Sequence, residues 1–142
     1  MKKKILPIVN VKLDQIVGGG QTIGTLESGK KIFAWGGLPD EIVSVQITKK
    51  KSKLAEGTVL EVLKPSEKRI TPKDADSYLS TSPWQIMTFE AEQDYKAALI
   101  EEAFELHDIV LPDKIDIFTD NKQYEYRNKI EFSWYWNKQT EQ

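Results

Sequence analysis

Short runs of alternating apolar and polar residues fill the first 63 positions of the chain. Alternation with a period of two is typical of a half-buried β-strand, because neighbouring side chains point to opposite faces. Stretches rich in glycine, proline and polar residues separate the runs and predict turns. Strands are expected at residues 5–13, 22–26, 31–35, 41–49 and 55–63. Several short strands with such turns favour a small β-barrel.

A different period begins at Ser82 and predicts a helix. Ser82, Pro83 and Gln85 have the order of a capping box, in which serine is the N-cap, proline takes the first helical position and glutamine follows the cap by three residues. Apolar residues then recur every three or four positions, which predicts one apolar stripe on a helix that ends near His107. Thr88 is able to cap a second start within this segment. The stripe consists of Trp84, Met87, Ala91, Tyr95, Ala98, Leu99, Ala103 and Leu106.

The end of the chain returns to alternation. Residues 115–118 and 124–136 predict the two strands of a β-hairpin, with a polar turn between them. The last strand carries Trp134 and Trp136, which need a partner surface. We therefore expect residues 67–142 to be marginally stable, or to self-associate, when isolated.

These elements together favour a mainly β chain with one or two helices, of the α+β class. Residues 1–66 are expected to form a small five-stranded barrel of the oligonucleotide-binding (OB) type, with residues 18–20 as a sharp glycine turn. Residues 67–142 are expected to supply a helix and a β-hairpin from an incomplete α/β domain.

Charge is divided unevenly between the two parts. Residues 1–70 contain 13 Lys and Arg against 7 Asp and Glu, whereas residues 71–142 contain 7 against 15, within a net charge of −2 for the whole chain. A basic half can attract a polyanion. An acidic half is typical of a solvated surface or of a face against another domain.

Composition excludes several kinds of site. The chain has no cysteine and one histidine, which excludes disulfides, thiolate-bound iron–sulfur clusters, cysteine nucleophiles and multi-histidine metal sites. The lack of cysteine favours a reducing cytoplasm. The apolar run after the basic N-terminus is too short for a signal peptide or a membrane span, so no membrane partner is expected.

A cluster of lysines stands at the turn between the fourth and fifth predicted strands. Lysines neutralise phosphates and release counterions, which contributes affinity for RNA without choice of sequence. The alternative is a solvated turn, because lysines commonly protect strand edges. The candidate RNA-binding cations are Lys30, Lys31, Lys49, Lys50, Lys51, Lys53 and Arg69.

Two aromatic residues of the third predicted strand are further candidates. Phe33 and Trp35 are two positions apart and therefore share a face. They could stack on RNA bases from the outside of the barrel. The alternative, which we favour on the sequence alone, is that they fill the barrel core.

The last predicted strand holds a second polar set, Tyr126-Arg127-Asn128-Lys129. On a strand, Arg127 and Lys129 would share one face, and Tyr126 and Asn128 the other. An arginine can fork onto a phosphate, and an asparagine can read a base edge. An edge strand with ordinary polar residues is the alternative.

The order of motifs resembles a known family. Residues 19–24, residues 29–43 with their Gly-Gly-Leu-Pro-Asp-Glu segment, and the exit at residues 65–72 resemble a TRAM domain. This is the small RNA-binding barrel that precedes the catalytic parts of RNA (uracil-5-)-methyltransferases, and it also occurs in radical methylthiotransferases. Residues 84–87 and 126–133 resemble the start of the methyltransferases' central domain. The Tyr-Arg-Asn-Lys strand is what points to uracil methylation.

The resemblance implies S-adenosylmethionine as methyl donor and ribosomal or transfer RNA as partner. The family's catalytic cysteine and its C-terminal S-adenosylmethionine domain are not in this chain. Many members carry cluster cysteines where residues 78–83 have none, so no iron–sulfur cluster is expected. We therefore expect the RNA-recognition part of such an enzyme, acting in RNA modification such as rRNA processing. A stand-alone, non-enzymatic TRAM-type RNA-binding protein and a barrel that docks an acidic protein are the alternatives.

Overall fold

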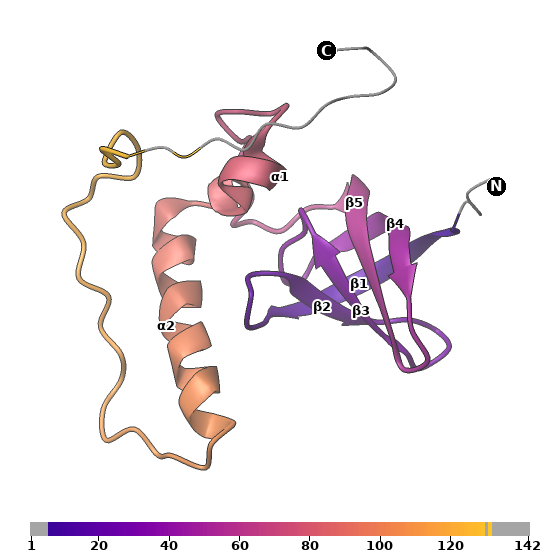
Figure 1. The fold of residues 1–142 in the computed structure, drawn as a ribbon, viewed down its shortest axis with the longest axis horizontal. Coiled ribbons are helices and arrows are strands. Elements are labelled where there is room, and N and C mark those ends of the chain that lie inside the picture. Colours follow the sequence, from indigo (N-terminus) through magenta and orange to yellow (C-terminus); the bar gives the residue numbers. More distant parts are fainter. Residues whose placement is uncertain (1–5, 130, 132–142) are drawn as a thin grey trace.

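The five predicted strands are all present and close into one barrel (Figure 1). A computed structural model describes residues 6–129 and residue 131. The strands are β1 (Ile8–Ile16), β2 (Thr22–Thr25), β3 (Lys31–Trp35), β4 (Ile42–Lys50) and β5 (Leu54–Lys64). Their order around the barrel is β1-β2-β3-β5-β4. The β3–β5 pair is parallel and the other neighbours are antiparallel.

Apolar side chains on the inner faces of the strands fill the barrel. In β3, Ile32 and Ala34 are buried whereas Lys31 is exposed, as the period of two predicts. Each fully buried valine, leucine or isoleucine contributes roughly 1.5–3 kcal/mol to stability. The buried members of this cluster are Val11, Leu13, Ile32, Ala34, Val43, Val45, Ile47 and Ala55.

Gly57 of β5 lies between β3 and β4, at a point where the three neighbouring strands are closely packed. It pairs with Ala34 in β3 and with Ile47 in β4. A Cβ atom at this position would lie 2.5 Å from Val45 Cγ1 and 2.6 Å from the carbonyl oxygen of Gln46. Only glycine lets the three strands approach this closely.

Three helical elements follow the barrel, and they correct the prediction of one helix from Ser82. They are α1 (Tyr78–Thr81), the 3₁₀ turn η1 (Pro83–Ile86) and α2 (Phe89–Glu105). Ser82 precedes η1 but its side chain makes no capping hydrogen bond. The predicted second start is correct, because Thr88 is the N-cap of α2. Within the predicted stripe, Met87 and Ala91 are buried, whereas Ala98 and Ala103 are exposed and Leu106 at its end is 76% exposed.

Long-range hydrogen bonds explain why the helix does not begin at Pro83. The buried Gln85 amide donates to Asp74 Oδ2 at 3.0 Å and accepts from the Asp74 N–H at 3.1 Å, so it cannot close a capping box. The Ile86 carbonyl accepts from the Ile70 N–H at 2.9 Å. Met87 is extended, with φ −127° and ψ 158°. These contacts hold the chain extended at Met87 and Thr88 before α2 starts.

The cap at Thr88 gives a testable consequence for α2. Its hydroxyl accepts from the Ala91 N–H at 3.3 Å and so satisfies a donor that the first turn leaves free. Thr88→Ala is expected to lower the free energy of unfolding by about 1 kcal/mol, measured by urea denaturation. Thr88→Ser keeps the hydroxyl and is the control, with stability near that of the wild type. An equal loss in both variants would contradict this role.

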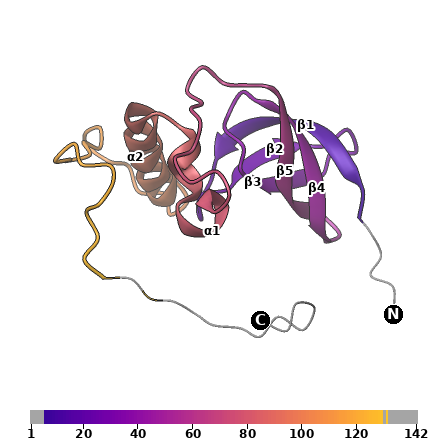
Figure 2. The ribbon, with the colours of Figure 1, turned by 90° about the horizontal axis from the view of Figure 1, so that it is seen from above.

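The helices pack against one end of the barrel (Figure 2). A second apolar cluster joins Ile16 and Leu38 of the barrel part to Ile86, Met87 and Ala91. The Trp84 Nε1–H donates to the carbonyl of Gly20 at 3.1 Å, and the Gly18 N–H donates to a Glu102 carboxylate oxygen at 3.2 Å. The glycine turn after β1 is therefore tied to η1 and to α2. The division of the chain at residue 66 stays a prediction.

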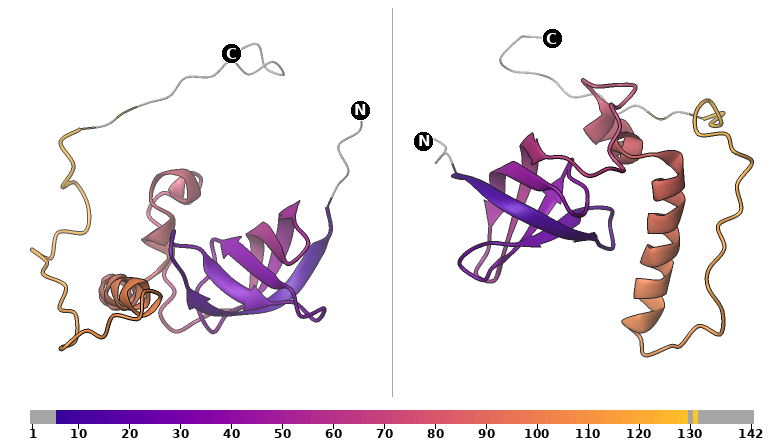
Figure 3. Two further views of the ribbon diagram at one scale, coloured as in Figure 1. Left: turned by 60° about the horizontal axis from the view of Figure 1, so that its bottom comes forward. Right: turned by 180° about the vertical axis from the view of Figure 1, so that it is seen from behind.

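The predicted hairpin is not formed in the part that the structure describes. Residues 115–118 and 124–129 contain no strand, and the segment after α2 runs as irregular chain (Figure 3). Glu125 has φ 60°, which an extended strand does not allow. An isolated hairpin is also marginal without a further strand or helix to cover it. Residue 130 and residues 132–142, with Trp134 and Trp136, lie outside the described residues. In the described part, no helix is long and apolar enough to cross a membrane.

Candidate nucleic-acid interface

Six of the predicted lysines gather at one end of the barrel. Lys31, at the start of β3, lies beside Leu54, at the start of β5, because these two strands are parallel and in register. The β4–β5 turn lies at the end of the barrel that points away from the helices (Figures 1 and 2). We call this set the lysine surface, which consists of Lys30, Lys31, Lys49, Lys50, Lys51 and Lys53.

The carboxylate of Glu56 offsets part of the positive charge of the lysine surface. Glu56 Oε1 lies 3.3 Å from Lys51 Nζ and 3.9 Å from Lys49 Nζ. Lys50 and Lys53 are exposed and make no ion pair with the residues that the structure describes. The surface therefore keeps a positive excess that is open to solvent.

Phe33 and Trp35 lie on the outside of the barrel, so the core interpretation of the sequence is wrong. Both are half-buried, while Ile32 and Ala34 between them face the interior. Phe33 pairs with Glu56 of β5, beside the lysine surface. Trp35 is at the opposite end of β3, toward the helices. Four residue steps along a strand separate the two ends of β3 by about 13 Å.

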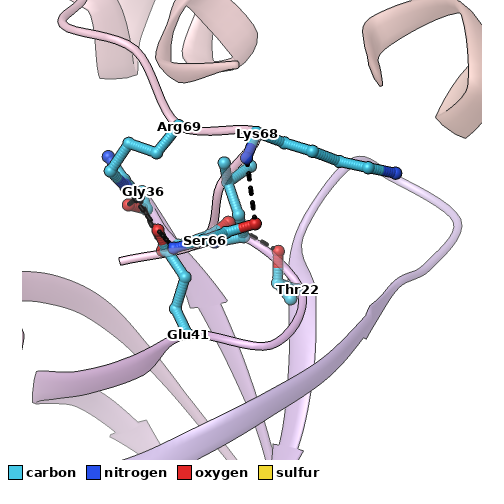
Figure 4. A network of polar contacts seen from close by, with 8 residues as sticks. Thr22, Gly36, Glu41, Ser66, Lys68 and Arg69 are labelled. Atoms are coloured by element: carbon cyan, nitrogen blue, oxygen red, sulfur yellow. Dashed lines mark hydrogen bonds and ion pairs between the residues drawn. The ribbon is translucent and has the colours of Figure 1, made fainter. Parts of the chain in front are cut away.

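Arg69 is not part of the lysine surface. Its Nε and one terminal nitrogen donate to the two carboxylate oxygens of Glu41, the latter at 2.8 Å (Figure 4). The same terminal nitrogen donates to the Gly36 carbonyl at 2.9 Å. Glu41 is fully buried and also accepts from the N–H groups of Leu38 at 2.8 Å and Ser66 at 3.1 Å. The pair fastens the segment that follows β5 onto the loop between β3 and β4.

Sequence reasoning missed this ion pair, although a signal for it was present. Glu41 is in phase with Val43, Val45 and Ile47, which all face the barrel interior. Period two therefore places a carboxylate on the buried side, and a buried carboxylate needs a cation. Arg69 is the residue that supplies it.

A cavity of about 840 Å³ lies where the barrel meets the helices. Its walls come from the glycine turn, from β3 through Trp35, from η1 through Trp84, from α2, and from residues 123–127. The structure thus brings together two sets that the sequence analysis kept apart, because Tyr126 and Arg127 line the same cavity as Trp35.

The Tyr126–Lys129 set does not have the two faces expected of a strand, since no strand forms there. The Arg127 guanidinium carbon lies 5.9 Å from the ring centroid of Tyr126. Lys129 forms an exposed ion pair with Glu131. Asn128 is exposed. Tyr126 and Arg127 are therefore the members of this set that face a defined site.

The described residues contain no cluster of metal ligands and no glycine-rich loop that leads into a helix. No group of three or more His, Asp or Glu in that part of the chain could hold a metal ion. Residues 18–20 connect the antiparallel strands β1 and β2 and lead into no helix, unlike a glycine-rich loop that cradles a nucleotide.

Comparison with known protein families decides what the barrel is. The model of the TRAM domain family matches residues 8–60, which are the strands and turns of the barrel up to the middle of β5. Residues 8–60 are a TRAM domain. The resemblance noted in the sequence is confirmed, and the outward aromatic residues and the lysine surface both belong to this TRAM domain.

Similar proteins extend the likeness beyond the TRAM domain. An uncharacterized RNA methyltransferase of Fusobacterium nucleatum is 29% identical over 95% of this chain and 30% of its own length. One from Clostridium tetani is 33% identical over 74% of this chain and 23% of its own length. The 23S rRNA (uracil(1939)-C(5))-methyltransferase RlmD of Vibrio cholerae is 49% identical over 30% of this chain and 10% of its own length. The chain therefore spans less than a third of each of these relatives.

Proposed function

We propose that this chain is the RNA-binding part of an S-adenosylmethionine-dependent RNA (uracil-5-)-methyltransferase that acts on ribosomal RNA in the cytoplasm. The similarity to RNA methyltransferases, one of them named for uracil in 23S rRNA, supports the reaction and the substrate. The chemistry of methyl transfer is assigned to residues other than these, because the chain has no cysteine and the residues that the structure describes include no glycine-rich turn that leads into a helix.

The observation that carries the proposal is the arrangement along β3 of the TRAM domain. Lys31 begins the strand within the lysine surface, Phe33 follows on the outer face, and Trp35 ends it at the cavity. Cations bind phosphates without regard to sequence, and exposed aromatic faces stack on bases. An RNA strand laid along β3 would meet both kinds of contact.

The lysine surface is tested by charge reversal. A variant with Lys49, Lys50, Lys51 and Lys53 changed to Glu is expected to bind RNA about 100-fold more weakly at 0.15 M salt. The slope of log affinity against log salt is expected to fall by about 2 to 4, because each lost phosphate contact removes about 0.9. Fluorescence anisotropy with a labelled ribosomal RNA fragment measures both quantities.

A charge-matched control separates this surface from net charge. Lys12, Lys64, Lys114 and Lys122 are exposed lysines outside the lysine surface, and changing all four to Glu alters the net charge equally. This control is expected to lose less than about tenfold in affinity, since distant exposed charges are screened. Equal losses of RNA affinity in the two variants, both shown by circular dichroism to be folded, would contradict the assignment of RNA binding to the lysine surface.

A further inference from the structure

We propose that the cavity between the barrel and the helices holds one unpaired nucleotide of the bound RNA. This inference rests on the proposed function, because the strand that enters the cavity is the one held along β3. It adds a discrimination that the lysine surface does not provide, since phosphate contacts position a strand and do not read its bases.

The size and walls of the cavity fit a nucleotide. Its volume of about 840 Å³ falls within the range of about 300–1,000 Å³ that is usual for small-molecule sites. Trp35, Trp84 and Tyr126 give it aromatic surfaces from three separate parts of the chain. The Trp84 ring is fixed by its hydrogen bond to Gly20, so one wall is in place before a ligand enters.

Arg127 is an exposed cation that lines the cavity and could meet a phosphate at its rim. Among the residues that the structure describes, no carboxylate forms an ion pair with Arg127, and its guanidinium is exposed. In the described part of the chain, three carboxylates line the cavity, of which Glu125 is exposed and the other two have partners. Glu92 pairs with Lys96 at 2.6 Å, and Asp74 accepts from the Gln85 amide. Arg127 is therefore the cation available to an incoming phosphate.

The geometry selects an unpaired nucleotide over a base pair. A base in a duplex has both faces covered by its neighbours, so it cannot also stack on Trp35 inside the cavity. An unstacked base can stack on Trp35. Such stacking tolerates any sequence, because every base has a π-face. β3 leads from the lysine surface to this position, so a strand whose phosphates lie on the lysines reaches Trp35 directly.

Filling the cavity tests the inference. Ser82 lines it, is exposed and makes no side-chain capping bond, so Ser82→Phe adds bulk without removing a contact. The full 142-residue chain is titrated with a 12-nucleotide single-stranded RNA and with the matching duplex. The wild type is expected to bind the single strand about tenfold more tightly, and Ser82→Phe to lose that preference while duplex affinity stays unchanged. Tyr126→Ala, on a side chain that is 60% exposed, is expected to lower the preference without unfolding the protein.

The control is Ala98→Phe, which adds the same ring to an exposed position of α2 that does not line the cavity. It is expected to keep the single-strand preference. Equal wild-type affinity for the two RNAs, or an unchanged preference in Ser82→Phe, would overturn the cavity assignment and leave the lysine surface standing. A wild type that binds neither RNA would overturn the proposed function as well.

Discussion

Replacing Arg69 by alanine is expected to lower the free energy of unfolding by about 3–5 kcal/mol. The change removes the guanidinium that donates to both oxygens of Glu41 and leaves that carboxylate buried without a cation. Removing one partner of a buried pair costs far more than the pair contributes, because the remaining charge has lost its hydration. Urea denaturation of the whole chain, followed by tryptophan fluorescence, measures the loss.

A surface ion pair from the same loop provides the matched control. Lys12 Nζ lies 3.7 Å from Asp40 Oδ1, and the two side chains are 63% and 82% exposed. Lys12→Ala is therefore expected to change stability by no more than about 1 kcal/mol. If Arg69→Ala and Lys12→Ala unfold at the same urea concentration, the buried Glu41 carboxylate does not need the Arg69 guanidinium for stability.

Gly57→Ala is expected to lower the stability by about 3 kcal/mol, the upper part of the usual range for overpacking. The new methyl group would meet Val45 Cγ1 at 2.5 Å and the Gln46 carbonyl oxygen at 2.6 Å, and the carbonyl belongs to a paired strand that cannot shift alone. For a chain of this size the melting temperature should fall by about 10 °C, as followed by circular dichroism.

Gly18→Ala is the control for this prediction. A Cβ atom at Gly18 would have no neighbour within 4 Å, and the residue is exposed in the turn after β1. Its melting temperature is expected to stay the same or rise slightly, since alanine restricts the unfolded chain. A Gly57→Ala variant as stable as Gly18→Ala would contradict the close approach of the three strands at Gly57.

The barrel was predictable because its information is local. Each strand carries its own alternation, and the residues that face inward in β3 and β4 are those that period two selects. The same rule, applied strictly, would have placed Phe33 and Trp35 outside, because Ile32 and Ala34 between them are the inner pair. Their aromatic character, which favours burial in general, led to the wrong interpretation.

The connection to α2 was less predictable because distant residues decide it. The Ser82-Pro83-Gln85 pattern is a good local signal for a helix start, but Gln85 bonds to Asp74 and Ile86 bonds to Ile70. Arg69 presents the same difficulty, since a positive charge in a polar segment after a strand looks like a surface residue until its partner is known. The cavity could not be predicted at all, because its walls come from separate segments that are spread along the chain from Gly19 to Arg127.

The parallel pairing of β3 with β5 also has a consequence for how the chain folds. β4 lies between these strands in the sequence but on the far side of β5 in the barrel, and β1 closes the barrel against β4. No hairpin alone can therefore complete the structure, and closure must wait until β5 has been synthesised. Non-local pairing of this kind slows folding and makes it all-or-none. During translation, the outer face of β3 would form in a single late event, when its neighbour on each side is in place.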